Sequence, residues 1–294
     1  MLVVTGPTGN VGSEVTHLLC GGTYPKPYRI AAHSPHKIKA CYGDQVPVVP
    51  FDYDDRAGWK MVLDGVSTLF LIFPLPTPRT AETRITPFVD AAKRAGAQHI
   101  VYLSVPGADR EKVIPHYHTE RHIEASGIPY TILRASFFMQ NLCRGLSTYG
   151  VDIIEHNEIF IPAGSDKTTF VDARDVARVA LKIFQNPELH RNKAYLLTGR
   201  ERLDFDAVAT IFSEVMGRPI RYRNPSSPHF WLRLGRRGVK WDVIAFMTII
   251  YTLTRTGKNE PLSDEMVQLL DRPPTTMRQF VTENLYRWEQ QIWT

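Results

Sequence analysis

Short runs of apolar residues recur along the first half of the chain, separated by longer segments with the apolar spacing of one helix face. The runs are rich in β-branched and aromatic residues and read apolar throughout, as do strands buried on both faces of a parallel sheet. Three of the intervening segments end in glycine, which suits the left-handed exit of a helix. We therefore predict alternating strands and helices. The predicted strands are 2–5, 28–32, 46–50, 68–73, 99–105 and 129–134.

This alternation predicts an α/β fold, a Rossmann-type doubly wound parallel sheet with helices on both faces. From about Phe138 the pattern loosens, and the last part of the chain looks mostly helical. We expect a dinucleotide-binding domain over 1–150, to which a later segment of about 168–200 returns. A smaller, mostly helical substrate-binding region is expected over 151–294.

Composition and charge restrict the classes of partner. The chain has 294 residues, of which 43% are hydrophobic, and a formal charge of +5, which suits an anionic ligand such as a phosphate-bearing cofactor. The densest basic cluster is LRLGRRGVK, with Arg233, Arg236, Arg237 and Lys240, and we interpret it as a solvated helix face. A nucleic-acid surface usually shows a longer basic stripe, so no nucleic-acid partner is expected.

The remaining bulk features indicate a cytoplasmic protein. Cys20, Cys41 and Cys143 form no C-x-x-C pair and no metal-ligand spacing, so we expect a reducing compartment and no metal. The N-terminus has a strand-like MLVVT where a signal peptide would have a charged region before an apolar core. The longest apolar run, 243–253, is too short to span a membrane, so we expect no membrane partner. We expect a monomer or a homodimer.

The stretch VVTGPTGNVGSEV joins the first predicted strand to the first predicted helix through Gly6, Gly9 and Gly12. A phosphate must be met at close range by backbone N–H groups, and a side chain at the contact would hold it away. The spacing is G-x-x-G-x-x-G, and the strand before it and the helix after it supply the context that a dinucleotide motif demands. A tight turn without a ligand is the alternative. We predict that a dinucleotide pyrophosphate binds here.

The segment after the second strand favours NADP over NAD. An NAD site usually has an acidic residue about 20 residues beyond the glycines, on the ribose hydroxyls. Here the sequence reads HSPHKIK, with His33, Ser34 and Lys37 as candidate ligands of a 2′-phosphate and no acid before Asp44. Ordinary loop polarity is the alternative. Asp52 could hydrogen-bond the adenine or cap the next helix.

Several stretches together resemble the NmrA-like family of atypical short-chain dehydrogenase/reductases. They are TGPTGNVG, VPFDYDD, GAQHIVYLSVPGA, PHYHTERHIEASGIPYTILRASFFMQN and FVDARDVARVA. The resemblance covers roughly residues 1–185 and is most specific over 116–141. It implies a Rossmann sheet with a small C-terminal domain and a preference for NADP. It also implies either a reductase of quinones, imines or similar acceptors or a protein that binds the dinucleotide without turnover.

The resemblance also implies roles for single residues. Gly6, Thr8, Gly9, Asn10 and Val11 would cradle the pyrophosphate. Phe73 and Pro74 would border the adenosine and ribose, Ser104 would lie near the nicotinamide, and the segment from Arg134 to Asn141, including Phe138, would reach the nicotinamide side of the cleft.

The predicted helix at 116–126 departs from the family at its catalytic position. Short-chain dehydrogenases generally use Tyr-x-x-x-Lys, in which the ammonium lowers the tyrosine pKa and holds the ribose. Tyr117 and Arg121 have this spacing, with arginine in the place of lysine. Arginine is forked and does not lose its proton, so it is no simple substitute. Tyr117 is a candidate proton donor and His116 a second one. The alternative is a surface tyrosine, with Arg121 paired to Glu120 or Glu124.

Aromatic residues indicate the kind of substrate. In LRASFFMQN the three apolar residues 137–139 cannot all face one way, so at least one could line a substrate pocket. Trp231, Trp241, Phe246 and Tyr251 would supply an opposite apolar wall, which favours a flat, aromatic or polycyclic substrate. We predict an NADPH-dependent reductase that transfers hydride to an apolar quinone, enone, carbonyl or imine. The alternatives are an NADP(H)-sensing regulatory protein without turnover and a cofactor-bound enzyme of non-redox rearrangement.

Overall fold

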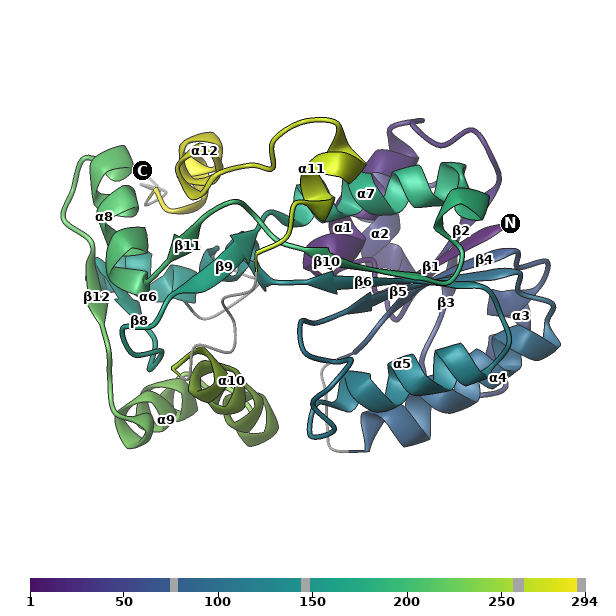
Figure 1. The fold of residues 1–294 in the computed structure, drawn as a ribbon, viewed down its shortest axis with the longest axis horizontal. Coiled ribbons are helices and arrows are strands. Elements are labelled where there is room, and N and C mark those ends of the chain that lie inside the picture. The colour runs from purple at the N-terminus through teal and green to yellow at the C-terminus, as the bar shows by residue number, and fades with distance from the viewer. Residues whose placement is uncertain (75–78, 144–148, 256–261, 290–294) are drawn as a thin grey trace. The chain divides into compact units, whose positions relative to one another are not determined.

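A seven-stranded, all-parallel sheet forms the centre of the first of two units in the computed structural model, which describes residues 1–74, 79–143, 149–255 and 262–289 (Figure 1). This sheet unit comprises Met1–Ala135 and Ala173–Leu197. The strand order is β10-β6-β5-β4-β1-β2-β3, the doubly wound order that the sequence predicts. Its strands are β1 (Leu2–Thr5), β2 (Tyr28–Ala32), β3 (Val48–Pro50), β4 (Thr68–Ile72), β5 (His99–Ser104), β6 (Tyr130–Ala135) and β10 (Lys193–Leu197).

Helices cover both faces of this sheet because its strands are apolar on both sides. In Figure 1, α1 and α7 lie on one face, and α3, α4 and α5 lie on the other. On the second face Tyr102, Ile100 and Leu69 of the sheet pack with Phe88 and Ile123 of the helices, all fully buried. The helices are α1 (Asn10–Cys20), α2 (Pro35–Tyr42), α3 (Trp59–Leu63), α4 (Thr86–Arg94), α5 (Pro115–Ala125) and α7 (Ala173–Gln185), with a π-helical turn at Ala81–Ile85 and a 3-10 turn at Pro187–His190.

The second unit comprises Ser136–Asp172 and Thr198–Thr294. It has two small sheets, ordered β11-β9-β7 and β12-β8. The first half contains β7 (Phe137–Phe138), the 3-10 turn Met139–Leu142, α6 (Tyr149–His156), β8 (Glu158–Phe160) and β9 (Thr168–Val171). The second half contains β11 (Arg202–Leu203), α8 (Phe205–Met216), β12 (Arg221–Arg223), α9 (Ser227–Arg236), α10 (Trp241–Thr254), α11 (Glu265–Leu270), α12 (Met277–Glu283) and the 3-10 turn Leu285–Arg287.

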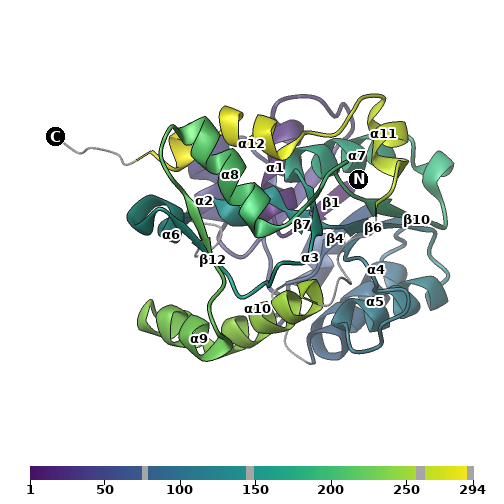
Figure 2. The same cartoon turned by 60° about the vertical axis from the view of Figure 1, so that its left-hand side comes forward.

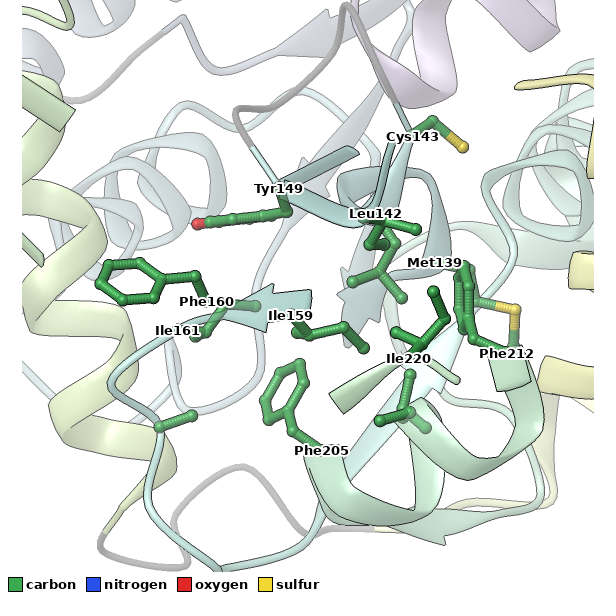
Figure 3. Packing of buried hydrophobic residues seen from close by; sticks show 14 of the residues in the cluster. Met139, Leu142, Cys143, Tyr149, Ile159, Phe160, Ile161, Phe205, Phe212 and Ile220 are labelled. Carbon is green, nitrogen blue, oxygen red and sulfur yellow. The ribbon is translucent and has the colours of Figure 1, made fainter. Parts of the chain in front are cut away.

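An aromatic and aliphatic cluster forms the core of the second unit. Figure 3 shows Phe205 and Phe212 of α8 packed with Ile159, Ile220 and Leu142. All five side chains are at most 5% exposed. This cluster orders the mostly helical second half around the two short sheets.

The division into units differs in position from the boundary expected at residue 150. The chain leaves the sheet unit after Ala135, at the end of β6, and returns at Ala173 with α7 and β10. Residue 150 lies inside α6, whose Ile153 and Ile154 are buried in the core of the second unit. The expected return over about 168–200 includes β9, which pairs with β7 and β11 and therefore belongs to the second unit.

One prediction about the helical region needs correction. The cluster Arg233–Lys240 is only partly solvated, because Arg237 donates to buried Asp152 at 2.6 and 2.9 Å and Arg233 donates to the same carboxylate at 2.9 Å. The apolar run 243–253 lies in α10, beside α9 (Figure 2), and is partly buried: Ile244 and Tyr251 are 1% and 2% exposed, whereas Ile249 is 56% exposed. Within the described ranges, no helix has the length and apolar character needed to cross a membrane.

Candidate functional site: a dinucleotide site at the carboxyl edge of the sheet

The glycine turn lies where the strand order of the sheet reverses. β1 pairs with β2 on one side and with β4 on the other, so the turn after β1 opens at the topological switch point. Gly6 has a φ of 62°, in the left-handed region, and a Cβ there would lie 3.1 Å from the Ile72 side chain at the end of β4. Gly6 is therefore required by the backbone itself.

The other two glycines of the turn differ in what they require. A Cβ at Gly12 would lie 1.9 Å from the Gly6 carbonyl oxygen, so Gly12 allows α1 to pack against the turn. A Cβ at Gly9 would lie 3.5 Å from the same oxygen, an ordinary contact, and the φ of Gly9 is −80°. Neither backbone nor packing requires glycine at Gly9. Its exposed position at the start of α1 leaves room for a ligand to approach the backbone.

The first turn of α1 suits a phosphate. Gly9 is the N-cap, no side chain caps the helix, and no acidic residue lies in its first turn. No carboxylate of that turn therefore neutralises the positive end of the helix dipole. The Val11 side chain is 1% exposed and belongs to the core, so only the backbone of Val11 could reach a ligand, whereas Thr8 is exposed. These residues fit a pyrophosphate.

The predicted adenosine side lies at the carboxyl ends of β2 and β3. His33 is 81% exposed, and its Nδ1 lies 3.3 Å from a carboxylate oxygen of Asp52. The other Asp52 oxygen accepts the Asp54 N–H at 2.9 Å. Ser34 is the N-cap of α2, and Lys37 is exposed in its first turn. The fold thus places an acid beside the basic loop, which the spacing along the chain did not reveal.

Phe73 and His116 lie on the other side of the switch point. Phe73, one residue after β4, stacks on the His116 ring with centroids 4.4 Å apart. His116 is 8% exposed, and its Nδ1 has no hydrogen-bond partner among the described residues. Burial lowers the pKa of His116 to about 4, so this imidazole is neutral at pH 7. Pro74 follows Phe73 and is half-buried.

The Tyr117 and Arg121 pair has the geometry that its spacing predicts. The Arg121 guanidinium carbon lies 5.8 Å from the centre of the Tyr117 ring. Arg121 is 44% exposed and donates to Glu124 at 2.8 Å, so the surface ion pair considered as the alternative also forms. Arg121 therefore lies over the tyrosine ring and on the helix surface at once.

A buried charge cluster beneath this pair was not predicted. Glu120 is fully buried and accepts the Ser104 hydroxyl at 2.5 Å. The Nε and Nη2 groups of Arg134, at the end of β6, donate to the two Glu120 oxygens at 3.1 and 2.7 Å. Ser104, expected near the nicotinamide, is 2% exposed, and its hydroxyl donates its hydrogen bond to Glu120. One signal in the sequence could have indicated that Glu120 is buried: it lies one helical turn after His116, on the same face of α5.

The remaining predicted residues belong to the second unit. Phe138 is half-buried in β7, where it pairs with Val171 of β9. Tyr251 is 2% exposed and packs against Phe230 and Tyr149, so it is a core residue of this unit. Trp231 is 39% exposed, and its indole donates to Thr248 at 2.9 Å. No group of His, Cys, Asp and Glu in the described chain could hold a metal ion.

Comparison with known proteins identifies the family. The chain matches the NmrA-like family over residues 1–260 and belongs to it. It is 29% identical over 284 residues to an NAD(P)H azoreductase of Xenophilus azovorans, covering 95% of this chain and 96% of the azoreductase. It is 34% identical over 230 residues to the (4-alkanoyl-5-oxo-2,5-dihydrofuran-3-yl)methyl phosphate reductase of Streptomyces griseus, covering 76% of each chain.

A solved structure supports the same assignment. The NADPH complex of the NADPH-dependent quinone oxidoreductase from Escherichia coli has a TM-score of 0.81 and 26% identity, covering 97% of this chain and 100% of that chain. The family and the Rossmann fold predicted from the sequence are thereby confirmed. The predicted enzyme class is confirmed as well, because the named relatives are oxidoreductases.

Proposed function

We propose that this member of the NmrA-like family is an NADPH-dependent reductase that transfers hydride to an apolar quinone, enone, carbonyl or imine. The observation that carries the proposal is the glycine turn at the switch point, where Gly9 is bare although neither its φ nor its packing requires glycine. A pyrophosphate bound against the first turn of α1 would explain why Gly9 has no side chain. The relatives named for NAD(P)H and NADPH agree with a nicotinamide cofactor.

The preference for NADPH is attributed to His33, Ser34 and Lys37. These residues offer hydroxyl and cationic groups at the end of β2, where the adenosine ribose is expected. Asp52 accepts from His33 if that imidazole carries a proton on Nδ1, and so orients it. Lys37→Glu should raise the Kd of NADPH about tenfold and that of NADH much less. Equal changes for the two cofactors in a fluorescence titration would remove Lys37 from the site.

Bound NADPH supplies the hydride, so the chain must hold the cofactor, orient the acceptor and supply a proton to its heteroatom. Two nearby groups are unsuited to that last task. His116 is neutral at pH 7, with a pKa of about 4, and the Ser104 proton is donated to Glu120. Tyr117, half-buried at the start of α5 under the Arg121 guanidinium, is the proposed donor.

The proposed acceptor is apolar because exposed aromatic side chains gather on α9 and α10 of the second unit. Trp231 and Trp241 are 39% and 68% exposed. Phe246 is half-buried on the same helix as Trp241. Exposed apolar side chains that lie close together are typical of a binding surface. The flat indole rings of the two tryptophans favour a flat aromatic substrate.

An NADP(H)-sensing protein without turnover is the second candidate. The observation that favours it is the exposure of Arg121 and its ion pair with Glu124, because a cation engaged at the surface is less suited to hold a ribose. Enzyme and sensor differ in one result. A sensor binds NADPH and fails to oxidise it with any quinone, enone or imine, whereas a reductase oxidises it with at least one. Arg121→Lys should raise turnover if the lysine of the family performs better in this position. A non-redox rearrangement would consume substrate without net NADPH loss.

A further inference from the structure

We infer that Arg134, held by Glu120, is the residue of the sheet unit that binds the oxygen of a neutral carbonyl acceptor, and that it selects quinones and enones against cationic imine-type acceptors. The inference rests on the proposed reductase function and narrows its substrate class. Ser104, Glu120 and Arg134 form a buried charge cluster that has no part in the proton transfer proposed for Tyr117.

Glu120 holds one edge of the Arg134 guanidinium and so fixes the orientation of the side chain. Nε and Nη2 both donate to Glu120, at 3.1 and 2.7 Å, as a two-point pair. Ser104 donates to the same carboxylate at 2.5 Å, so Glu120 accepts three hydrogen bonds within the cluster. Burial alone would lower the pKa of Arg134, but the hydrogen bond and the charge of Glu120 outweigh it, so the pKa is raised and the cation is retained. Glu120 is thus a positioning residue for Arg134.

The opposite edge of the guanidinium is available to a ligand. Nη1 has no hydrogen bond to any residue in the described ranges, and its nearest carboxylate oxygen, on Asp109, lies 3.9 Å away. Of the three clustered residues only Arg134 reaches the surface, since its side chain is 17% exposed, against 2% for Ser104 and none for Glu120. The two N–H groups of Nη1 can therefore meet a ligand while the rest of the side chain stays fixed.

The place of Arg134 in the sheet favours the acceptor end of the site. Arg134 is the second-last residue of β6, which lies beyond β4 and β5 in the strand order, on the side of the switch point opposite to β2 and β3. If the pyrophosphate lies at the turn after β1 and the adenosine at β2, the reacting half of the ligands lies over β4, β5 and β6. Arg121 is more exposed and pairs with Glu124, so Arg134 is the better placed cation.

The charge balance around Arg134 selects the chemistry of the ligand. Arginine offers only donors, so its partner must present a lone pair. Three arginines and three carboxylates adjoin one another in this cluster, so it has no excess positive charge for a phosphate. They are Arg134, Arg121 and Arg110 with Glu120, Glu124 and Asp109. A neutral carbonyl oxygen fits such a site, and its polarisation by Nη1 would favour hydride transfer to the conjugated carbon. A cationic acceptor has no lone pair to offer and is repelled by the guanidinium.

The test compares two acceptors in a complex that cannot react. The protein saturated with NADP⁺ is titrated by calorimetry with 2-methyl-1,4-naphthoquinone and with a cationic triphenylmethane dye. The paired substitution Arg134→Met with Glu120→Gln removes the cation without leaving a buried charge unpaired. A matched control, Arg191→Met with Glu188→Gln, removes an exposed Arg–Glu pair of the same unit. Melting temperature and the Kd of NADP⁺ report on the fold.

We expect the Arg134 pair of substitutions to raise the quinone Kd about tenfold or more, with the dye Kd unchanged or lowered and the control like wild type. Equal changes for the two ligands, no change, or a wild-type preference for the dye would overturn the inference. If that variant does not fold, Arg134→Lys keeps the charge beside Glu120 and is expected to shift the quinone-to-dye ratio in the same direction. An unchanged ratio then overturns it. Failure of the wild-type protein to bind NADP⁺ would instead reject the proposed function.

Discussion

The glycine turn makes a prediction that separates folding from binding, because Gly9 and Gly12 are bare for different reasons. Gly12→Ala places a methyl group 1.9 Å from the Gly6 carbonyl oxygen and 2.8 Å from its carbon, so α1 must move away from the turn. Overpacking of this kind costs about 1–3 kcal/mol. Each kcal/mol lowers the Tm of a domain of this size by about 2–4 °C. We expect Gly12→Ala to lower Tm by about 2–12 °C.

Gly9→Ala should have the opposite profile. The added methyl lies 3.5 Å from the Gly6 oxygen, and the φ of −80° is open to alanine. Gly9 is the N-cap of α1, where alanine is less favourable than glycine, so the replacement should cost about 1 kcal/mol or less. The same methyl would stand where a pyrophosphate must approach the backbone. We expect the Kd of NADPH to rise about tenfold or more, equivalent to about 1.4 kcal/mol, with little change in Tm.

The assay is a melting curve and an NADPH fluorescence titration for each variant. Gly235→Ala is the control, because its added methyl lies in α9 with its nearest neighbour, Trp241, at 3.9 Å. It should leave the Kd of NADPH unchanged. A wild-type Kd of NADPH for Gly9→Ala, or a loss of Tm as large as that of Gly12→Ala, would contradict the separate roles of the two glycines.

Three further predictions concern the buried imidazole of His116, the ion pair of Arg237 and the hydroxyl of Tyr117. Burial lowers the pKa of His116 from 6.5 to about 4, so the unfolded chain takes up a proton that the folded chain does not. The contribution of His116 to the free energy of unfolding should therefore fall by about 1.4 kcal/mol per pH unit as the pH is lowered from about 6.5 to 4. Chemical denaturation of His116→Gln at several pH values should lack this part of the pH dependence. Arg237→Ala breaks hydrogen bonds to buried Asp152 and should cost about 2 kcal/mol in urea unfolding, whereas Arg278→Ala, at an exposed pair with Glu214, should cost under about 1 kcal/mol; similar costs would contradict the role of burial. Tyr117→Phe should lower kcat about 100-fold with the Kd of NADPH little changed, and unchanged turnover would mean that Tyr117 is not the proton donor.

Local patterns in the sequence predicted the sheet unit closely. The expected strands 2–5 and 28–32 coincide with β1 and β2, because apolar β-branched runs bounded by turn residues leave little choice of conformation. Helix α12 likewise begins at a local signal, a full capping box between Thr276 and Gln279. In both cases a few neighbouring residues determine the element.

Features that depend on contacts between distant residues could not be predicted in this way. Glu120 and Arg134 lie on a helix and on a strand, and their pairing arises only when α5 packs on the carboxyl edge of the sheet. Likewise, His33 meets Asp52 because β2 and β3 end side by side. The expansion to a π-helical turn at Ala81–Ile85, just before Pro87, was also not expected from an apolar spacing that fits an ordinary helix.

NADPH turnover distinguishes a reductase from a dinucleotide-sensing protein. Purified protein is incubated with NADPH and a neutral apolar quinone, and the loss of NADPH absorbance is compared with the hydroquinone formed. The proposed reductase predicts saturable oxidation of NADPH with one hydroquinone per NADPH, faster than with NADH. Tight NADPH binding with no oxidation by any quinone, enone or imine in the panel would contradict it and establish a dinucleotide-sensing protein in its place.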